Sequence, residues 1–287
     1  MVDLLAEVVV PIAMFVMMFG MGLTLSISDF KQVMVFPKAV LLGLFIQLLL
    51  MPAAGFGVAS AFSLNTMVAV GLVALASSPG GTLSNVVAHL GKGNTALSIS
   101  LTGLATMVAL FTMPLWINLS LQYFGGPETT VEVPVLKTAL NLAMFTVVPV
   151  TIGMYARSRA PHLEKHEPYL SRGSALTTFV AFIIASIAEG GNTGTSPTAV
   201  IVPCMALIAA AILLGFGIPR VMGVNLKDSA TTSVEVCMKN VVLPIFVAMN
   251  SLDSLEAAMP SMVYTAGMVP AAATVMIAFN LFKKNTE

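Results

Sequence analysis

The chain has 287 residues, of which 57% are hydrophobic and only 9% are charged, and its mean hydropathy is +0.94. Soluble domains carry about 25% charged residues, so this composition excludes a soluble protein and indicates a polytopic membrane protein in a lipid bilayer. The formal net charge is zero, which argues against a nucleic-acid partner.

Hydropathy and the positions of glycine, proline and polar clusters predict nine membrane-spanning helices. Each predicted segment has about the 20 residues that a helix needs to cross a bilayer core of about 30 Å. We therefore expect an all-α membrane protein. The predicted spans are residues 6–25, 36–61, 66–90, 94–124, 134–157, 172–190, 197–219, 227–250 and 257–282.

The basic residues predict the orientation of these spans. If the N-terminus lies outside, eleven of the thirteen Lys and Arg residues fall in inside segments. Lys137 alone falls outside, and Lys239 falls within a span. This asymmetry follows the positive-inside rule and supports nine spans, with the C-terminus in the cytoplasm and the protein in the cell (inner) membrane.

Two of the spans contain helix breakers. In the third span, Pro79 removes a backbone donor, and Gly80 and Gly81 loosen the following turn. In the eighth span, Pro244 frees the carbonyl of Asn240, although one kinking proline is common in membrane helices. Interrupted helices in matching positions of two halves indicate a binding site near the bilayer midplane.

A short sequence echo links these same two spans. SNVV at 84–87 and KNVV at 239–242 occur five spans apart, and segments an odd number of spans apart cross the bilayer in opposite directions. The echo is weak by itself, but the breakers strengthen it. It predicts two inverted repeats, residues 1–133 with four helices, lacking the first helix of the repeat, and residues 134–287 with five.

Several motifs resemble those of the bile acid:sodium symporter family, in its nine-helix form. They are MFGMGLTL at 18–25, QLLLMP at 47–52, PGGTLSN at 79–85, GNTALSISLT at 93–102 and EVCMKN at 235–240. The resemblance implies a sodium/proton-antiporter-like fold, with two crossed broken helices, a core domain and a panel domain. The panel would be helices 6–25, 134–157 and 172–190, and the core would be helices 36–61, 66–90, 94–124, 197–219, 227–250 and 257–282.

The same resemblance implies a first sodium site. Its residues here would be Ser84, Asn85, Ser98, Thr102 and Glu235. Sodium is a hard cation that prefers several oxygen ligands, and this set offers one carboxylate with hydroxyl and amide oxygens. Taken singly, a serine or threonine in a membrane helix more often bonds to a neighbouring turn or helix, so the hypothesis depends on their joint placement.

A second sodium site of the family would use Gln47, Glu235, Val236 and Met238, but its glutamine is replaced here by Lys239. An ammonium at about 4 Å would oppose sodium by about 4 kcal/mol at an effective dielectric of about 20, which favours one ion over two. One hypothesis places the ammonium where the second sodium would bind, paired with Glu235. The alternatives are an inert i,i+4 ion pair, direct binding of a substrate anion, and proton coupling through Lys239.

The two half-helices that begin at the breaks direct their amides and the positive ends of their dipoles toward the crossing, which favours an anionic substrate there. The resemblance implies Thr82 and Asn240 as its polar contacts. The first helix of the panel, with Met14, Met17, Met18 and Met21, would add an apolar wall, although methionines in such a helix more often serve packing alone. We therefore expect a sodium-coupled symporter of a small organic anion, a carboxylate or sulfonate, with bile-acid-like compounds among the candidates. The alternatives are a sodium-independent or proton-coupled organic anion transporter that uses Glu235 and Lys239 and, with less support, a channel. No enzyme is expected, because no catalytic cluster falls within the spans, and the sequence names no protein partner.

Overall fold

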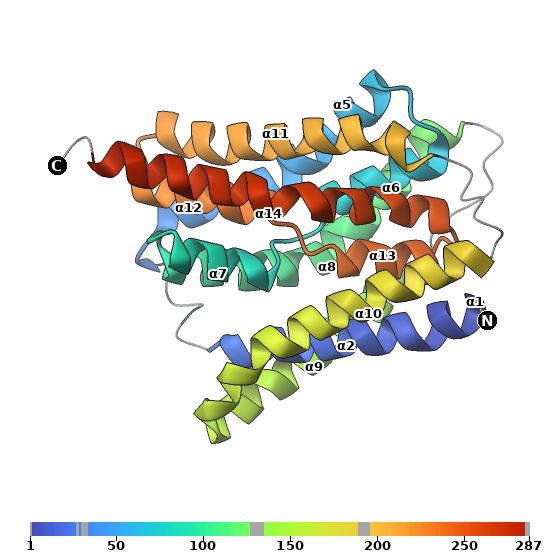
Figure 1. Cartoon of the computed structure of the whole chain (residues 1–287), viewed down its shortest axis with the longest axis horizontal. Helices are drawn as coiled ribbons and strands as arrows, with labels where there is room; N and C mark the ends of the chain where they lie inside the picture. Colours follow the sequence, from blue (N-terminus) through green and yellow to red (C-terminus); the bar gives the residue numbers. More distant parts are fainter. Residues whose placement is uncertain (1, 27–28, 30–33, 127–134, 189–195, 285–287) are drawn as a thin grey trace.

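The computed structural model describes residues 2–26, 29, 34–126, 135–188 and 196–284, and within these ranges the chain is helical (Figure 1). In the same ranges the backbone forms no sheet, only one isolated antiparallel bridge between Gly80 and Lys239. The all-α class predicted from the composition is therefore confirmed for the described residues.

Within the described ranges, seven helical segments are long and apolar enough to cross a membrane. They match seven of the nine predicted spans, but the predicted span at 172–190 begins earlier. Pro161 starts a short 3-10 helix there that continues into α10, because proline suits the first position of a helix. The segments are Val2–Thr24 (α1 Val2–Leu4, η1 Leu5–Val9, α2 Val10–Thr24), Pro37–Ala61 (α4 Pro37–Phe45, η3 Ile46–Leu50, α5 Met51–Ala61), Thr95–Gly125 (α8), Leu136–Arg159 (within α9 Val135–Arg159), Pro161–Ala188 (η4 Pro161–His166, α10 Glu167–Ala188), Thr198–Val221 (within α11 Pro197–Val221) and Leu255–Lys284 (α14).

The two remaining predicted spans are each divided into two shorter helices. One consists of α6, Thr66–Ser77, and α7, Thr82–Leu90. The other consists of α12, Leu226–Cys237, and α13, Val242–Asn250. Half-helices of this length cannot cross the bilayer alone, since about 20 residues are needed.

The breaks lie beside the residues expected to cause them. Residues 78–81 separate α6 from α7 and include Pro79, Gly80 and Gly81. Residues 238–241 separate α12 from α13, and Pro244 lies in the first turn of α13. The first amides of a helix have no intrahelical partner, so proline costs no hydrogen bond at that position.

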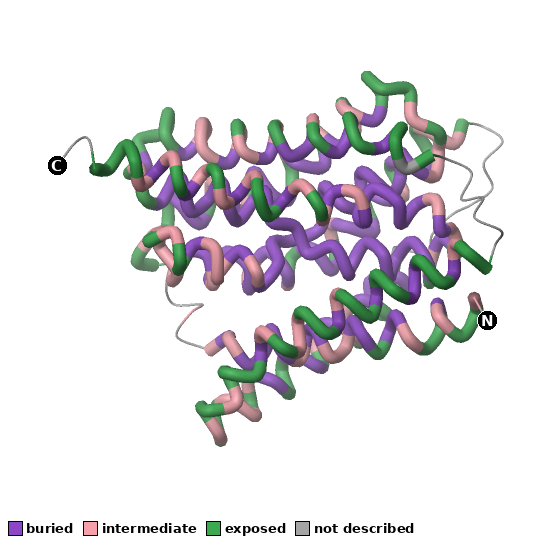
Figure 2. The backbone as a smooth tube through the Cα atoms, viewed as in Figure 1, coloured by how far each residue is buried: buried purple, intermediate pink, exposed green. Residues whose placement is uncertain are grey.

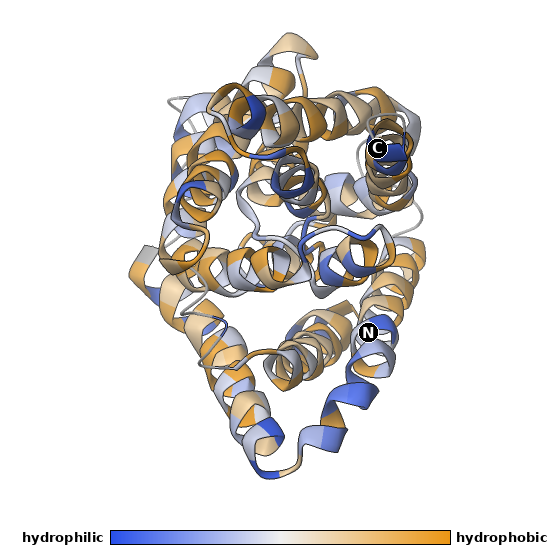
Figure 3. Cartoon of the chain, turned by 90° about the vertical axis from the view of Figure 1, so that its left-hand side faces the viewer, coloured by the Kyte–Doolittle hydropathy of each residue, from blue (hydrophilic) through white to orange (hydrophobic). Residues whose placement is uncertain are grey.

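Three helical segments form a separate group, which we call the three-helix group: α1 to α2, α9, and η4 to α10. The helices from α4 to α8 and from α11 to α14 form the larger group (Figures 1 and 3). Within the three-helix group the backbones of α2 and α9 approach closely. A Cβ at Gly22 would overlap the Val150 carbonyl, and a Cβ at Gly153 would overlap the Phe19 carbonyl. Glycine is common at such contacts between membrane helices because it lets backbones approach.

The most deeply buried helices are in the centre of the larger group (Figure 2). Helix α12 is buried at every residue from Asp228 to Cys237, although five of these residues are serine, threonine or glutamate. By contrast, the outer faces of the long helices expose large apolar side chains such as Leu140, Leu213 and Ile277. A polar interior with apolar outer faces reverses the pattern of a soluble protein and suits a protein surrounded by lipid.

Candidate functional site

The two interrupted segments meet at their breaks. The Gly81 amide donates to the Met238 carbonyl at 2.8 Å, and the Asn240 amide donates to the Pro79 carbonyl at 2.8 Å. These reciprocal bonds hold the two breaks against each other. As a result, the C-terminal ends of α6 and α12 and the N-terminal ends of α7 and α13 lie together inside the protein. Each helix end presents backbone groups that lack intrahelical partners.

Gly80 sits in this crossing at a position that leaves no room for a side chain. A Cβ there would overlap Oε1 of Glu235. We therefore expect Gly80→Ala to destabilise the purified protein by about 1 to 3 kcal/mol, the usual cost of overpacking, and to lower its thermal unfolding midpoint in detergent. Gly57→Ala is the matched control, because a Cβ there meets no atom within 4 Å. Equal midpoints for the two variants would contradict the crowding at Gly80.

Glu235 is fully buried beside the crossing and accepts three hydroxyl hydrogen bonds. Ser84 Oγ and Ser98 Oγ each donate to its Oε2 at 2.6 Å, and Thr102 Oγ1 donates to its Oε1. These hydroxyls come from α7 and α8, whereas the carboxylate comes from α12. A buried carboxylate is costly without such partners, so the three hydroxyls stabilise it inside the protein.

Asn85 adds an amide oxygen to the same group. Its Oδ1 lies 3.4 Å from Thr102 Oγ1. The structure thus brings together all five residues that the sequence predicts for a first sodium site. Together they offer one carboxylate, three hydroxyls and one amide oxygen. Such a set carries a single negative charge, which suits a hard monovalent cation.

Lys239 lies in the break between α12 and α13, and its side chain is buried. Its Nζ donates to the Ala76 carbonyl at 3.0 Å and to the Ser78 carbonyl at 2.9 Å. These carbonyls belong to the C-terminal end of α6, where free acceptors and the helix dipole favour a cation.

The close pair expected between Lys239 and Glu235 does not form. Among the described residues, no ion pair within 4 Å joins the two side chains; the pairs present link Arg157 to Asp29 and Glu164. Residues four apart share a face only within one continuous helix, and α12 ends at Cys237, between Glu235 and Lys239. The inert i,i+4 pair is therefore ruled out in this conformation.

The other residues predicted for a second sodium site are engaged elsewhere. Gln47 lies in the π-helical turn η3, and its Oε1 accepts from the Gly80 amide at 3.0 Å. The Met238 carbonyl accepts from Gly81, and the Val236 side chain packs in a hydrophobic cluster. The side-chain oxygen of Gln47 and the carbonyl oxygen of Met238 thus already accept hydrogen bonds from backbone amides in this conformation.

Sequence reasoning missed one polar contact at the crossing. The Tyr264 hydroxyl, from α14, donates to the Cys237 carbonyl at 2.8 Å and so satisfies the C-terminal end of α12. The break in α12 predicts that some donor must reach its free carbonyls, but nothing local identifies which residue does so.

A cavity of about 160 Å³ lies next to the crossing, between the three-helix group and the larger group. Thr82 lines it from the first turn of α7, and Met17 lines it from α2. Asn240, the second predicted contact, does not line it: its Oδ1 accepts from the Leu243 amide at 3.3 Å, at the start of α13. The neighbouring Lys239 does line the cavity.

Comparison with known proteins gives one family. Residues 11–196 match the model described as the Sodium Bile acid symporter family. A probable sodium/metabolite cotransporter of chloroplasts in Oryza sativa subsp. japonica is 30% identical over 85% of this chain and 59% of its own length. An uncharacterized sodium-dependent transporter of Bacillus subtilis is 28% identical over 87% of this chain and 76% of its own. The human ileal sodium/bile acid cotransporter is 30% identical over 81% of this chain and 66% of its own length. The chain therefore spans about three fifths of the plant relative's length.

Proposed function

Because the chain belongs to the sodium/bile acid symporter family, a family of membrane transporters and not of enzymes, we propose that it carries a small organic anion together with one sodium ion by alternating access. The observation that carries this proposal is the set of oxygen donors around Glu235. They come from α7 and α8, the carboxylate comes from α12, and the groups converge where two interrupted helices meet. An ionisable residue inside a membrane protein usually marks an ion or substrate pathway.

The proposed architecture consists of a panel and a core. The three-helix group corresponds to the panel predicted from sequence, and the larger group corresponds to the core. The two interrupted segments would occupy equivalent positions in inverted repeats, residues 1–133 and 134–287. In this arrangement the core moves against the panel, and the cavity between them is open to one side of the membrane at a time. The separation of the two groups in Figure 3 supports this division.

We place the sodium ion between Glu235 and the oxygens of Ser84, Asn85, Ser98 and Thr102. No second sodium is proposed, because the ammonium of Lys239 binds the Ala76 and Ser78 carbonyls at the end of α6. Those carbonyls are the kind of ligand that a sodium ion would otherwise use. Lys239 thus acts as a fixed positive charge beside the crossing.

The substrate is proposed to bind in the cavity beside Thr82. The N-terminal end of α7 directs its amides toward this region, and the positive end of its dipole favours an anionic group. At about 160 Å³ the cavity is smaller than the roughly 300 Å³ or more of pockets for drug-sized ligands. A small carboxylate or sulfonate therefore fits better than a steroid conjugate. Asn240 is proposed to join the contacts only when the crossing rearranges.

The protein is proposed to lie in the cell (inner) membrane with the N-terminus outside and the C-terminus in the cytoplasm. The distribution of basic residues along the sequence supports this orientation. The seven long helices together with the two interrupted segments supply the nine spans that it requires.

Uptake by proteoliposomes tests the function. With an inward sodium gradient we expect saturable uptake of small carboxylates, with a Hill coefficient for sodium near one. A proton gradient applied alone should drive little uptake. Uptake driven by protons and indifferent to sodium would instead support the alternative in which Lys239 and Glu235 exchange protons. Flux that does not saturate would favour a channel.

A further inference from the structure

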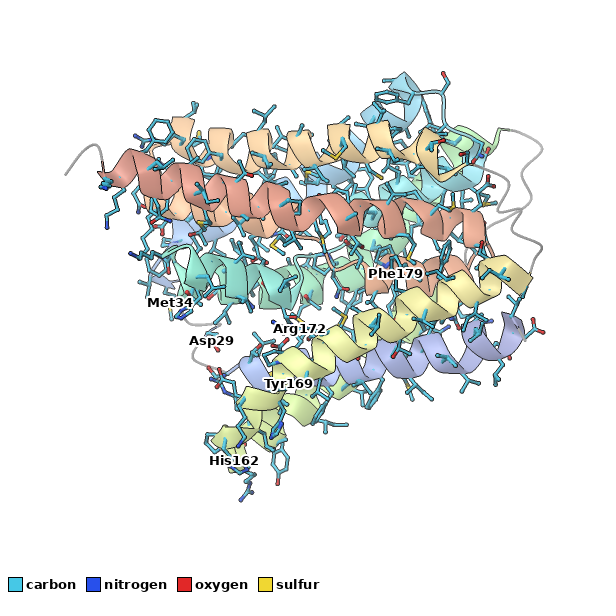
Figure 4. The ribbon with its side chains drawn as sticks, in the orientation of Figure 1. Asp29, Met34, His162, Tyr169, Arg172 and Phe179 are labelled. Atoms are coloured by element: carbon cyan, nitrogen blue, oxygen red, sulfur yellow. The ribbon has the colours of Figure 1, made fainter. Side chains whose placement is uncertain are left out.

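Helix α10 places two charged residues on the wall of the cavity. Glu167 and Ser171 lie one turn apart and so share a face, and Arg172 follows directly. All three line the cavity together with Thr82. In Figure 4 the labelled Arg172 lies on the side of α10 nearest to α7. From the sequence, Arg172 counts only as one of the eleven inside basic residues, and Glu167 and Ser171 have no predicted role.

Glu167 is only 5% exposed. Its Oε1 accepts a hydrogen bond from Ser171 Oγ at 2.6 Å. Ser171 Oγ in turn lies 3.2 Å from Thr82 Oγ1. Within the described part of the chain, no ion pair includes Glu167. A nearly buried carboxylate without a cationic partner is costly, so its placement beside the cavity points to a role in binding.

Arg172 is exposed, and the described residues include no ion-pair or hydrogen-bond partner for its guanidinium. A guanidinium has five N–H donors in a planar fork that fits both oxygens of a carboxylate. An unpaired arginine beside a cavity is therefore available to bind an anionic group.

We propose that α10 selects the substrate: Arg172 binds its carboxylate, and Glu167 accepts a hydrogen bond from a hydroxyl or ammonium group on the same molecule. The selected class is then a small monocarboxylate that also carries such a donor. This inference rests on the proposed transport of an organic anion. Glu167 also acts against other anions. It repels a second negative charge, and a keto or unsubstituted acid offers no donor to its second oxygen, since Ser171 donates to Oε1.

Three acids with the same carbon skeleton test the role of Glu167: α-hydroxyisovalerate, α-ketoisovalerate and isovalerate. Their binding to the purified protein in saturating sodium can be measured by calorimetry. We expect the hydroxy acid to bind at least about tenfold more tightly than the other two. Glu167→Met should remove most of this preference. The control is Glu164→Met, which changes an exposed glutamate on η4 outside the cavity.

Arg172→Gln tests the other half of the proposal. It should weaken binding of all three acids by about ten- to hundredfold, since a charge-assisted pair is lost. Arg172→Lys should restore only part of the affinity, because lysine lacks the planar fork. Arg159→Gln is the matched control: Arg159 is exposed on α9 and lies outside the cavity. Sodium should raise the unfolding midpoint of every variant equally, because α10 contributes no ligand to the sodium site.

The outcomes distinguish the role of α10 from the proposed transport. If the acids bind only in sodium but without preference for the hydroxyl group, or if Arg172→Gln leaves their affinity unchanged, the role of α10 is contradicted and the transport proposal stands. If none of the acids binds and sodium stabilises no variant, the proposed function itself is contradicted.

Discussion

Replacing Glu235 by glutamine is expected to abolish sodium-driven uptake. Glu235 supplies the one negative charge in the proposed ion site, and its carboxylate is held by Ser84, Ser98 and Thr102. At about 4 Å and an effective dielectric of about 20, the attraction between a carboxylate and a sodium ion is about 4 kcal/mol. Its loss corresponds to a roughly thousandfold weaker affinity for sodium.

Glutamine has the shape of glutamate: its oxygen can accept from the hydroxyls on one side, and its amide nitrogen can donate to those on the other, so the Glu235→Gln protein should still fold. Sodium should no longer raise its thermal unfolding midpoint, whereas it should raise the midpoint of the wild-type protein and of a Glu164→Gln control. Glu164 is about half exposed and lies away from the crossing. Wild-type sodium stabilisation in Glu235→Gln would show that the ion binds elsewhere.

Lys239→Gln should change the number of sodium ions that act together. The ammonium now binds the Ala76 and Ser78 carbonyls, and its charge opposes a second cation by about 4 kcal/mol at about 4 Å. Glutamine removes that charge and supplies an oxygen. We expect the Hill coefficient for sodium-stimulated uptake to rise from near one toward two.

Lys239→Met separates the loss of the positive charge from the gain of an oxygen ligand. Methionine removes the charge but offers no oxygen and leaves the two carbonyls at the end of α6 without their donor. We expect its Hill coefficient to stay near one and its stability to fall, because each buried carbonyl that loses its partner costs about 1 to 3 kcal/mol. Identical cooperativity in the wild-type protein and Lys239→Gln would contradict the idea that Lys239 replaces a sodium ion.

Much of the fold could be predicted because it depends on local properties of the chain. The long apolar runs predict seven spans that the structure contains as continuous helices. The breaks follow from residues that cannot continue a helix, such as Pro79 with Gly80 and Gly81. The early start of α10 does not follow from the sequence, because the charged residues after Pro161 are typical of a loop although they are helical here.

The oxygen donors around Glu235 could be named from the sequence, but only through a family resemblance. Serine and threonine are common in membrane helices, and their local pattern does not say which of them reach a given carboxylate. The structure places Ser84, Ser98 and Thr102 on Glu235 because α7, α8 and α12 pack together at the crossing.

By itself, the sequence determined that this is a helical membrane protein, where its spans lie and where two of them are interrupted, since hydropathy and helix-breaking residues act over a few turns of the chain. Only the tertiary structure decided which helix ends meet, that Lys239 binds the end of α6 rather than Glu235, and that Glu167 and Arg172 face a cavity beside Thr82. Those contacts join residues far apart in the chain, so they depend on the packing of whole helices and leave no local pattern.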